Sequence, residues 1–341
     1  MDIELFEERA RIIRGTRAFF DRRGYLELDT PLLAPDLIPE ACLEVFETAY
    51  LPPGIAAGGR PYWLIPSPEI WMKRFIARHR RSIYQVCKCF RNVESLGRQH
   101  SPEFTMLEYY TMNAGYLDSL ALTEEFFGEL LGDTGQVELR PPFLRITMEE
   151  AFERWAGFNL YEAAEAGRLG EEARRLGLDP APGRTRGEGL QGEGDTGALY
   201  DLIFIHAVEP KLPRDRPVAL IDYPAFVPCL ARGSPKGRLG GSCRTRERWE
   251  LYVRGIELAN CYSEETGPEE VRRYFDAETA RKEGSALVPH RVDRDYWKLF
   301  LPDAAGGPFP SCSGVALGLD RLVMVLTGRS SIDGVLPFPM N

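Results

Sequence analysis

Long apolar stretches are missing from this sequence of 341 residues. No run approaches the roughly 18 apolar residues that a membrane-spanning helix requires. The first 15 residues, MDIELFEERARIIRG, are charged and lack the apolar segment of a secretory signal peptide. The chain has 44% hydrophobic and 27% charged residues, as ordinary globular proteins do. We therefore expect a globular protein of the cytoplasm that is not bound to a membrane.

Cysteines at metal-binding spacings are also lacking. The seven cysteines form an odd and scattered set. Cys87 and Cys89 are separated by one residue instead of two, and neither a second pair nor a histidine lies at zinc-ligand spacing. We predict reduced thiols and no metal-thiolate site. The alternation in IYQVCKCF predicts that Cys87 and Cys89 point to one face of a strand.

A general excess of positive charge is absent, because the net charge is −9. This balance argues against a protein that relies on a broad grip on nucleic-acid phosphates. Residues 73–91 are a local exception, with seven Lys and Arg residues and no acidic residue. The segment is either a solvated surface or a patch for an anionic ligand or an acidic partner.

Apolar spacing and turn residues divide the chain into helices and strands, without an internal repeat. We expect helices at about 3–23, 67–79, 117–132, 147–176 and 267–283, and strands at 25–31, 43–51, 62–66, 82–92, 217–225 and 248–262. Strands that neighbour one another along the chain favour an α+β fold with an antiparallel sheet flanked by helices. We expect a single domain over residues 1–341, with a helical segment at about 117–176 and a mobile Gly-rich loop at about 180–197.

Charged residues lie in four stretches where a strand or helix end should be apolar. Taken alone, a charged residue in any one of these stretches is most simply explained as a side chain that faces solvent. Together they indicate arginines for an anion, paired carboxylates for a divalent cation, and further carboxylates for a cationic substrate. That combination suits nucleotide chemistry. No P-loop and no set of kinase motifs is present, so a nucleotide must be bound in another way.

The same stretches resemble the motifs of class II aminoacyl-tRNA synthetases of the lysyl type. FRNVESLGRQHSPEFTMLEYY, residues 90–110, resembles motif 2, and GVALGLDRLVMVLTG resembles motif 3. GYLELDTPLL resembles motif 1, and GIELANCYSEE resembles the amino-acid-pocket segment. The resemblance follows the family's order from about residue 5 to residue 338. It implies a class II synthetase-like catalytic domain.

Lysyl-tRNA synthetases carry an anticodon-binding domain ahead of motif 1, whereas here the motif 1 helix is expected within a few residues of Met1. In its length and in the residues of its motifs, the chain resembles the elongation factor P lysine ligase family. That family activates lysine, preferably (R)-β-lysine, with ATP and transfers it to a lysine side chain of elongation factor P. The resemblance implies ATP and Mg²⁺ as cofactors, elongation factor P instead of tRNA as partner, and a homodimer formed through motif 1.

The resemblance also implies roles for individual residues. Arg91 contacts the α-phosphate of ATP and Arg321 the γ-phosphate, so these two arginines are the expected catalytic groups. The other nucleotide and Mg²⁺ contacts are Phe104 stacked on adenine, Glu94 near adenine, His100 closing the motif 2 loop, and the metal ligands Glu250 and Glu257. The amino-acid pocket is formed by Glu69, Glu108, Tyr110, Asn260, Tyr262, Glu264 and Ala316.

The sequence departs from the family pattern at several positions. The motif 2 loop is one residue longer than usual and Val93 replaces a glutamate, which leaves the register of Glu94 and Arg98 open by one position. Cys261 replaces a glycine, and we expect its side chain to narrow the pocket. Ala316 stands where the ligase family has alanine and lysyl-tRNA synthetases have glycine, which favours the ligase.

Two other functions stay open on the sequence alone. One is a free-standing enzyme that forms lysyl-adenylate for tRNA or for a small molecule. The other is a catalytically inactive synthetase paralogue that serves as a binding module. The presence of Arg91, Glu250, Glu257 and Arg321 disfavours the inactive paralogue, because a binding module does not need them.

Overall fold

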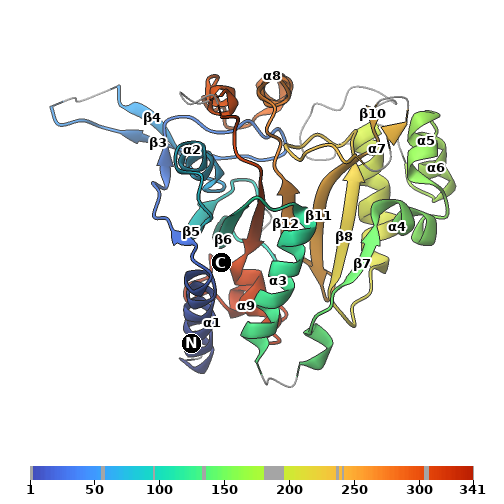
Figure 1. Cartoon of the computed structure of the whole chain (residues 1–341), viewed down its shortest axis with the longest axis horizontal. Helices are drawn as coiled ribbons and strands as arrows, with labels where there is room; N and C mark the ends of the chain where they lie inside the picture. Colours follow the sequence, from blue (N-terminus) through green and yellow to red (C-terminus); the bar gives the residue numbers. More distant parts are fainter. Residues whose placement is uncertain are drawn as a thin grey trace. The chain divides into compact units, whose positions relative to one another are not determined.

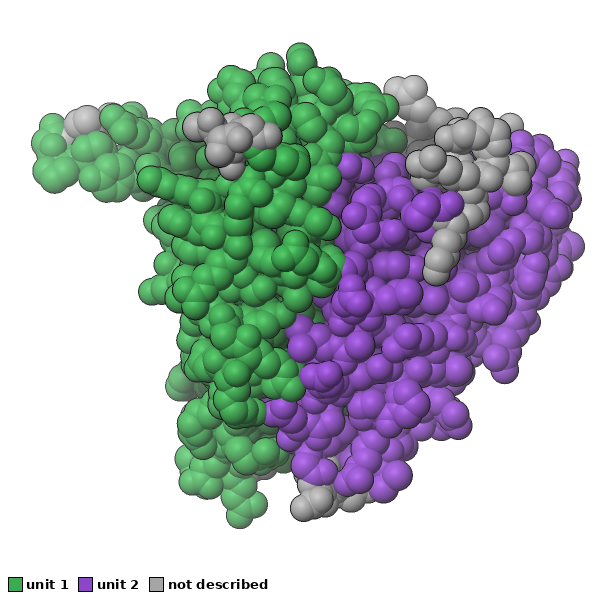
Figure 2. All heavy atoms as spheres, viewed as in Figure 1, with its two compact units in different colours: residues 1–114, 266–341 green, residues 115–265 purple. Residues whose placement is uncertain are grey.

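The structure, a computed structural model, describes residues 3–54, 58–94, 97–132, 136–179, 196–235, 238–239, 242–302 and 307–340. The chain forms two compact units (Figure 2). Unit 1 consists of residues 1–114 and 266–341, and unit 2 consists of residues 115–265. None of the helices in the described ranges has both the length and the apolar character needed to cross a membrane.

Unit 1 is built from both ends of the chain. Its elements, labelled in Figure 1, are α1 (Ile3–Arg22), β1 (Leu26–Glu27), β2 (Leu33–Ala34), β3 (Phe46–Tyr50), β4 (Arg60–Leu64), α2 (Glu69–His79), β5 (Ile83–Phe90), β6 (Glu103–Met112), α8 (Pro268–Ser285), η4 (Tyr296–Phe300), β13 (Cys312–Gly318), α9 (Leu319–Leu326) and η5 (Ile332–Gly334). The strands β1-β5-β6-β13 lie side by side in this order, and β2, β4 and β3 form a separate small sheet. Pairing is antiparallel except between β1 and β5.

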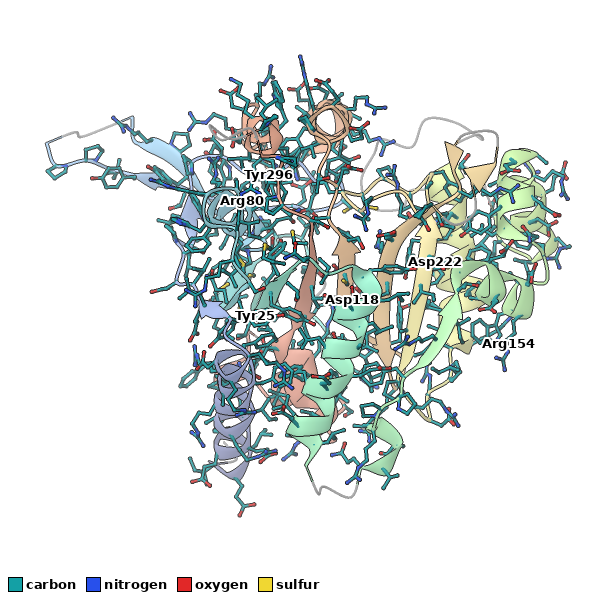
Figure 3. All side chains as sticks on the ribbon, in the orientation of Figure 1. Tyr25, Arg80, Asp118, Arg154, Asp222 and Tyr296 are labelled. Atoms are coloured by element: carbon teal, nitrogen blue, oxygen red, sulfur yellow. The ribbon has the colours of Figure 1, made fainter. Side chains whose placement is uncertain are left out.

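One face of the β5-β6 pair in unit 1 is closed by α1. The ring of Phe20 in α1 stacks on Tyr84 of β5, with 5.0 Å between ring centroids, and packs against Tyr109 of β6 at 4.8 Å. All three rings are fully or almost fully buried. This face is therefore a hydrophobic core, and the chemistry of the unit belongs to the other face. Tyr25, just before β1, hydrogen-bonds Thr111 at 2.7 Å and is labelled in Figure 3.

Unit 2 is formed by one continuous segment. Its elements are α3 (Tyr116–Leu131), η1 (Val137–Leu139), β7 (Leu144–Thr147), α4 (Met148–Trp155), α5 (Leu160–Glu165), α6 (Leu169–Arg175), α7 (Thr196–Ile203), η2 (Phe204–Val208), η3 (Glu209–Lys211), β8 (Val218–Pro224), β9 (Arg238–Leu239), β10 (Ser242–Cys243), β11 (Thr245–Val253) and β12 (Ile256–Ser263). The strands β12-β11-β8-β7 are neighbours in this order, with only the β7-β8 pair parallel.

Local sequence explains the boundaries of several elements in unit 2. Thr147 and Glu150 form a capping box that starts α4. The side chain of each residue accepts a hydrogen bond from the backbone N–H of the other. The turn between β11 and β12 consists of Arg254 and Gly255, both with positive φ. Two successive residues of this kind give the tight turn that suits the twist of a hairpin.

The predicted α+β fold with a mainly antiparallel sheet is confirmed. The helix expected at 117–132 corresponds to α3, whereas the segment 147–176 is divided into α4, α5 and α6. The expected helical segment at 117–176 also contains η1 and the strand β7. Of the predicted Gly-rich loop, residues 180–195 lie outside the described residues, and 196–197 begin α7.

Candidate active site

One face of the unit 1 sheet carries several of the predicted site residues. Gln85 in β5, Glu108 in β6 and Ala316 in β13 stand opposite one another in register. Opposite residues in neighbouring strands lie on the same face of a sheet, and side chains alternate along each strand. Phe104 and Tyr110 therefore share the face of Glu108. We call this side of the β5-β6-β13 sheet the Glu108 face.

Strand β13 contributes only small groups to this face at three successive positions. Gly314 stands opposite Tyr110, Ala316 opposite Glu108, and Gly318 two residues further along the strand. Ala316 is partly exposed, while its neighbours Val315 and Leu317 on the other face are fully buried. The small side chains leave room beside Glu108 for a ligand.

Glu108 is a buried acid, with 3% of the residue exposed. Its Oε1 accepts a hydrogen bond of 2.7 Å from the Tyr110 hydroxyl. Its Oε2 has no hydrogen-bond partner among the residues that the structure describes. Burial raises the pKa of Glu108 well above its usual range, and the charge of Glu69 raises it further. Unit 1 thus brings together Glu69, Glu108, Tyr110 and Ala316, the residues of this unit that the resemblance assigns to the amino-acid pocket.

Glu69 is the first residue of α2 and forms an ion pair with Lys73 one turn later. The Lys73 side chain is 1% exposed, and the Nζ–Oε1 distance is 2.5 Å. The positive charge of Lys73 also acts on Glu108, where it lowers the pKa against the larger effects of burial and Glu69. The positive charge of the buried Lys73, one turn after the start of α2, therefore acts on the carboxylates of both Glu69 and Glu108.

Arg91 and Phe104 lie at the other end of the same strands. The guanidinium carbon of Arg91 is 5.2 Å from the centre of the Phe104 ring, within cation–π distance. The Nε atom of Arg91 is buried and has no hydrogen-bond partner in the described part of the chain. The backbone N–H of Arg91 donates to the carbonyl oxygen of Pro102, which closes the loop between β5 and β6. The ring face of Phe104 and the guanidinium group of Arg91 therefore lie next to each other.

His100 connects the remaining predicted nucleotide contacts. Burial lowers the pKa of His100, and the positive charges of Arg321 and Arg91 lower it further, against an opposite effect of Glu94. Arg321, Arg91 and Glu94 therefore all lie within electrostatic reach of His100. The imidazole is neutral at pH 7 because its pKa is below the usual value of 6.5, so it can donate or accept one hydrogen bond at each nitrogen.

The end of the motif 2 loop is held in place by the C-terminal part of unit 1. The Nε of Arg321 donates to the carbonyl oxygen of Gln99 at 3.0 Å. The N–H of Ile332 donates to the carbonyl oxygen of Arg98 at 2.7 Å. Val93 at the start of the loop has a φ of 59°, a left-handed conformation that a β-branched residue rarely adopts. The longer loop thus begins with backbone strain.

The predicted site residues of unit 2 lie mainly on one face of the β11-β12 hairpin. Glu250 stands opposite Asn260, and Arg248 stands opposite Tyr262. A register shift at Leu251/Tyr252 then places Tyr252 opposite Glu257. Such a bulge changes the direction of one strand and can aim a side chain differently. The predicted metal ligands Glu250 and Glu257 come from the two strands of this hairpin.

Glu250 is already engaged by two donors of its own unit. Its Oε1 accepts from Arg248, and its Oε2 accepts from the Tyr252 hydroxyl at 2.9 Å. The Arg248 guanidinium also lies over the rings of Tyr223 and Tyr262, at 4.4 and 5.4 Å. Burial raises the pKa of Tyr252, followed by the negative charges of Glu250 and Glu257. Both carboxylates therefore act on the same tyrosine.

The donor set of unit 2 is compatible with magnesium. Within the described ranges, no group of three or more His, Cys, Asp or Glu side chains is arranged to hold a metal ion. Magnesium in nucleotide enzymes is usually held by one or two carboxylates together with substrate phosphates. Glu250 and Glu257 supply such a pair, although Arg248 competes for one oxygen of Glu250.

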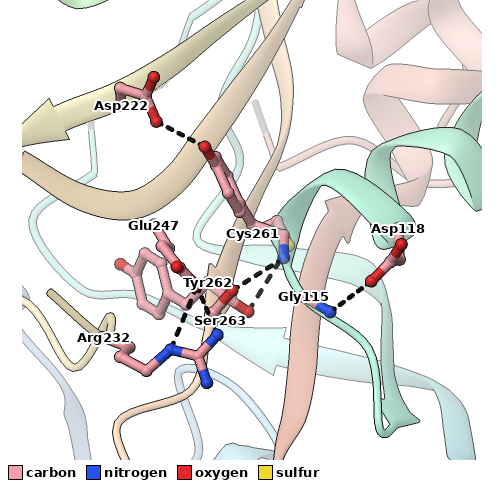
Figure 4. Close-up of polar contacts among 9 residues, drawn as sticks. Gly115, Asp118, Asp222, Arg232, Glu247, Cys261, Tyr262 and Ser263 are labelled. Atoms are coloured by element: carbon pink, nitrogen blue, oxygen red, sulfur yellow. Dashed lines mark hydrogen bonds and ion pairs between the residues drawn. The ribbon is translucent and has the colours of Figure 1, made fainter. Parts of the chain in front are cut away.

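The expectation that Cys261 narrows the pocket is wrong. Cys261 stands opposite Trp249 and is fully buried. It lies on the hairpin face where Ser263 accepts a hydrogen bond from the N–H of Tyr116 in α3, at 2.8 Å (Figure 4). Asn260 and Tyr262 point to the other side and are partly exposed. The side chain of Cys261 is therefore part of the packing below α3.

Glu264 follows β12 and is buried, with 3% exposed. Its backbone pairs with Ala231 in an isolated antiparallel bridge. The adjacent Arg232 forms an ion pair with Glu247, with 2.7 Å between Nη2 and Oε2, shown in Figure 4. The segment after Leu230 thus lines the end of β12 and fixes the backbone position of Glu264.

Sequence reasoning missed Gln85, Lys73 and Arg248 as members of these clusters. Gln85 lies two residues before Cys87 in the same strand and therefore on the same face as Cys87 and Cys89. A polar residue at this position of the alternating pattern was the signal available in the sequence. Cys87 and Cys89 do share one face, with 3.8 Å between their Sγ atoms, as predicted. Arg248 pairs with Glu250, two residues later, and Lys73 pairs with Glu69, four residues earlier. Both glutamates were predicted as site residues.

Comparisons with known proteins show the family of this chain. A family model for tRNA synthetases class II (D, K and N) matches residues 3–341. A protein of Vibrio vulnificus named elongation factor P–(R)-β-lysine ligase is 35% identical over 337 residues, which cover 99% of this chain and 96% of that protein. Proteins of the same name from Erwinia tasmaniensis and Yersinia enterocolitica are each 35% identical over 334 residues, covering 98% of this chain and 94% of theirs.

Both comparisons extend over nearly the whole chain. This chain therefore belongs to the tRNA synthetases class II (D, K and N), and its full-length relatives within that family include elongation factor P–(R)-β-lysine ligases.

Proposed function

We propose that this chain is an ATP-dependent ligase that activates lysine, specifically (R)-β-lysine, and joins it to a lysine side chain of elongation factor P. The names of the full-length relatives support this substrate and this partner. The observation that carries the proposal is the position of Glu69 and Glu108: the charge of Glu69 acts on Glu108, and the positive charge of the buried Lys73 acts on both acids. A cationic substrate relieves their repulsion.

ATP is proposed to bind at the Arg91 end of the Glu108 face. Arg91 is suited to the α-phosphate because its fork binds two oxygens, and its Nε atom lacks a partner in the described part of the chain. Phe104 beside it offers a ring face for adenine, with Glu94 near the base. Arg321 would contact the γ-phosphate, and the neutral His100 would hold the motif 2 loop closed.

Magnesium is proposed as the metal cofactor, held by Glu250 and Glu257. When bound, it would neutralise phosphate charge and complete its coordination with phosphate oxygens and water. Arg248 keeps Glu250 oriented through its hydrogen bond, and Tyr252 fixes the second oxygen. The family resemblance also assigns Asn260, Tyr262 and Glu264 of unit 2 to binding of the amino acid.

The first chemical step forms an aminoacyl-adenylate. A carboxylate oxygen of the amino acid attacks the α-phosphorus, the bond to the bridging oxygen breaks, and pyrophosphate leaves. This reaction needs positioning and charge stabilisation more than an acid or a base. In this proposal Arg91 and Arg321 supply both, because their guanidinium groups offer positive charge and hydrogen-bond donors to the triphosphate.

The second step forms an amide. The neutral amine of the target lysine attacks the carbonyl carbon of the adenylate, the bond to the phosphate oxygen breaks, and AMP leaves. Ala316 beside Glu108 supports (R)-β-lysine as the amino acid, because a methyl group at this position changes the space available in the amino-acid pocket.

We further propose that the enzyme acts in the cytoplasm as a homodimer formed through motif 1, with elongation factor P and not tRNA as acceptor. The experiment combines the purified chain with ATP, Mg²⁺ and radiolabelled lysine or (R)-β-lysine, and offers either elongation factor P or tRNA. We expect label on elongation factor P, with a higher rate for (R)-β-lysine. Label on tRNA would overturn the proposal, and failure to release pyrophosphate with either amino acid would indicate an inactive paralogue.

A further inference from the structure

We propose that Gln85 is a further substrate-binding residue, whose amide oxygen acts together with Glu108 Oε2 to bind the side-chain ammonium group of the amino acid. The inference rests on the proposed function, since it assigns a residue to the same pocket. Neither the motifs nor the family resemblance pointed to Gln85.

The two side chains are direct neighbours. Gln85 stands opposite Glu108 in the antiparallel β5-β6 pair. Side chains in such a position lie on one face with Cβ atoms about 4.5–5.5 Å apart. Gln85 is 1% exposed and Glu108 is 3% exposed. Their polar ends are therefore enclosed within the same part of the Glu108 face.

In each side chain one polar atom forms a hydrogen bond and the second polar atom, an oxygen, has no partner among the described residues. The Nε2 of Gln85 donates to Thr30 Oγ1 at 3.0 Å, and Glu108 Oε1 accepts from Tyr110 at 2.7 Å. Gln85 Oε1 and Glu108 Oε2 are buried, and neither has a hydrogen-bond partner among the described residues. Buried polar atoms are rarely left in this state in a folded protein. Two acceptors held in this way suit a ligand that donates hydrogen bonds.

The charges specify which donor fits. Burial and Glu69 raise the pKa of Glu108, so a negative charge at Glu108 is unfavourable until a cation arrives. An ammonium group carries a positive charge and three donors, which satisfies two acceptors at once. The neutral amide of Gln85 supplies the second acceptor without adding a third carboxylate to Glu69 and Glu108.

The position along the strand indicates which end of the amino acid is bound. Glu108 lies four residues from Phe104, which is about 13 Å along a β-strand. The reacting carboxylate must reach the phosphate at Arg91, beside Phe104. The group at Glu108 is therefore the far end of the amino acid, its side-chain ammonium. Lysine and (R)-β-lysine share this group, and norleucine lacks it.

The test uses Gln85→Met, which keeps the size of the side chain and removes the oxygen. Affinities for lysine, norleucine and ATP are measured by calorimetry on the full chain. Wild type is expected to bind lysine at least a hundredfold more tightly than norleucine. In Gln85→Met, lysine affinity should fall at least tenfold, while norleucine and ATP affinities change less than twofold. Gln136→Met, the same change in unit 2, should leave all three affinities unchanged.

A second variant acts from outside the pocket. Thr30→Val removes the partner that fixes the Gln85 amide and is expected to weaken lysine binding at least threefold, with ATP affinity unchanged. This variant decides the question if Gln85→Met fails to fold, as judged by circular dichroism. Lysine binding within twofold of wild type in a folded Gln85→Met protein would overturn the role of Gln85 and leave the proposed function intact. A wild-type protein that does not prefer lysine over norleucine would overturn both.

Discussion

Arg9 in α1 and Asp320 in α9 form a buried ion pair, with 2.6 Å between Nη2 and Oδ1. Both residues also hold Thr105 of β6. The Arg9 guanidinium donates to its Oγ1 at 3.1 Å, and Asp320 accepts from its N–H at 2.6 Å. The pair joins the two ends of unit 1 to the sheet, on the side opposite the Glu108 face. Because Asp320 precedes Arg321, this contact also helps to set the position of Arg321, the arginine that we propose for the γ-phosphate.

Removal of Arg9 should therefore destabilise the protein strongly. Arg9→Met leaves the Asp320 carboxylate buried without its counter-charge, a change that typically costs about 3–5 kcal/mol. Urea denaturation would measure the loss. Arg11→Met is the matched control on the same helix, since Arg11 pairs with Glu8 at the surface and should contribute about 1 kcal/mol or less. Equal effects of the two variants would contradict the assigned importance of the Arg9–Asp320 pair.

Loss of the Arg91 guanidinium should abolish adenylate formation. Removal of one fixed charge contact from a transition state typically costs about 3 kcal/mol, or more than a hundredfold in rate. We expect Arg91→Ala to show no measurable lysine-dependent pyrophosphate exchange. Arg81→Ala removes an exposed arginine just before β5 and should keep the wild-type rate. Near-normal exchange in Arg91→Ala would show that Arg91 does not contact the reacting phosphate.

The carboxyl group of Glu40 should make the stability of the fold depend on pH. Burial, followed by the charge of Glu69, raises the pKa of Glu40 from 4.5 to about 7. The folded state therefore holds a proton that the unfolded state releases between these values, and this group lowers stability as pH rises from 4.5 to 7. The full effect is about 3 kcal/mol.

Glu40→Gln removes this effect. The unfolding free energy of the variant relative to wild type should increase as pH rises from 5 to 8, and level off above 8. Chemical denaturation at pH 5, 6, 7 and 8 gives the comparison. A difference that is constant over this range would mean that Glu40 titrates at the same pH in both states.

The left-handed backbone of Val93 should be a source of strain. A non-glycine residue in this region costs roughly 1–2 kcal/mol, and the branched Val side chain is exposed here, so packing does not offset the cost. We expect Val93→Gly to stabilise unit 1 by about 1 kcal/mol, measured as a rise in thermal midpoint. Val93→Ala, which keeps a Cβ atom, should gain less. A lower midpoint for the Gly variant than for the Ala variant would contradict this conformation.

Residues that lie in one motif could be predicted from the sequence, because their relation to each other is local. Arg91 directly follows β5, whereas Phe104 and Glu108 lie in β6, and strand periodicity alone places Phe104 and Glu108 on the same face. The α+β fold followed from strands that neighbour each other along the chain. These predictions needed no knowledge of which strands pair.

The missed contacts depend on pairing between distant segments. Arg9 and Asp320 are at opposite ends of the chain, and nothing near either residue indicates the other. Gln85 became a pocket residue only when the register placed it opposite Glu108. Cys261 was misplaced because it was considered as a substitution in a motif, whereas its face is fixed by its pairing with Trp249.

The hydrogen bond from Gln85 to Thr30 has a consequence for how substrate preference evolves. Thr30 lies in the segment before Pro31 that resembles motif 1, and it does not belong to the proposed pocket. If the Gln85 amide recognises the ammonium group, a substitution at Thr30 changes the orientation of that amide without altering any residue that meets the substrate. A lineage can then shift its choice of amino acid through a position that sequence comparison of pocket residues alone would overlook.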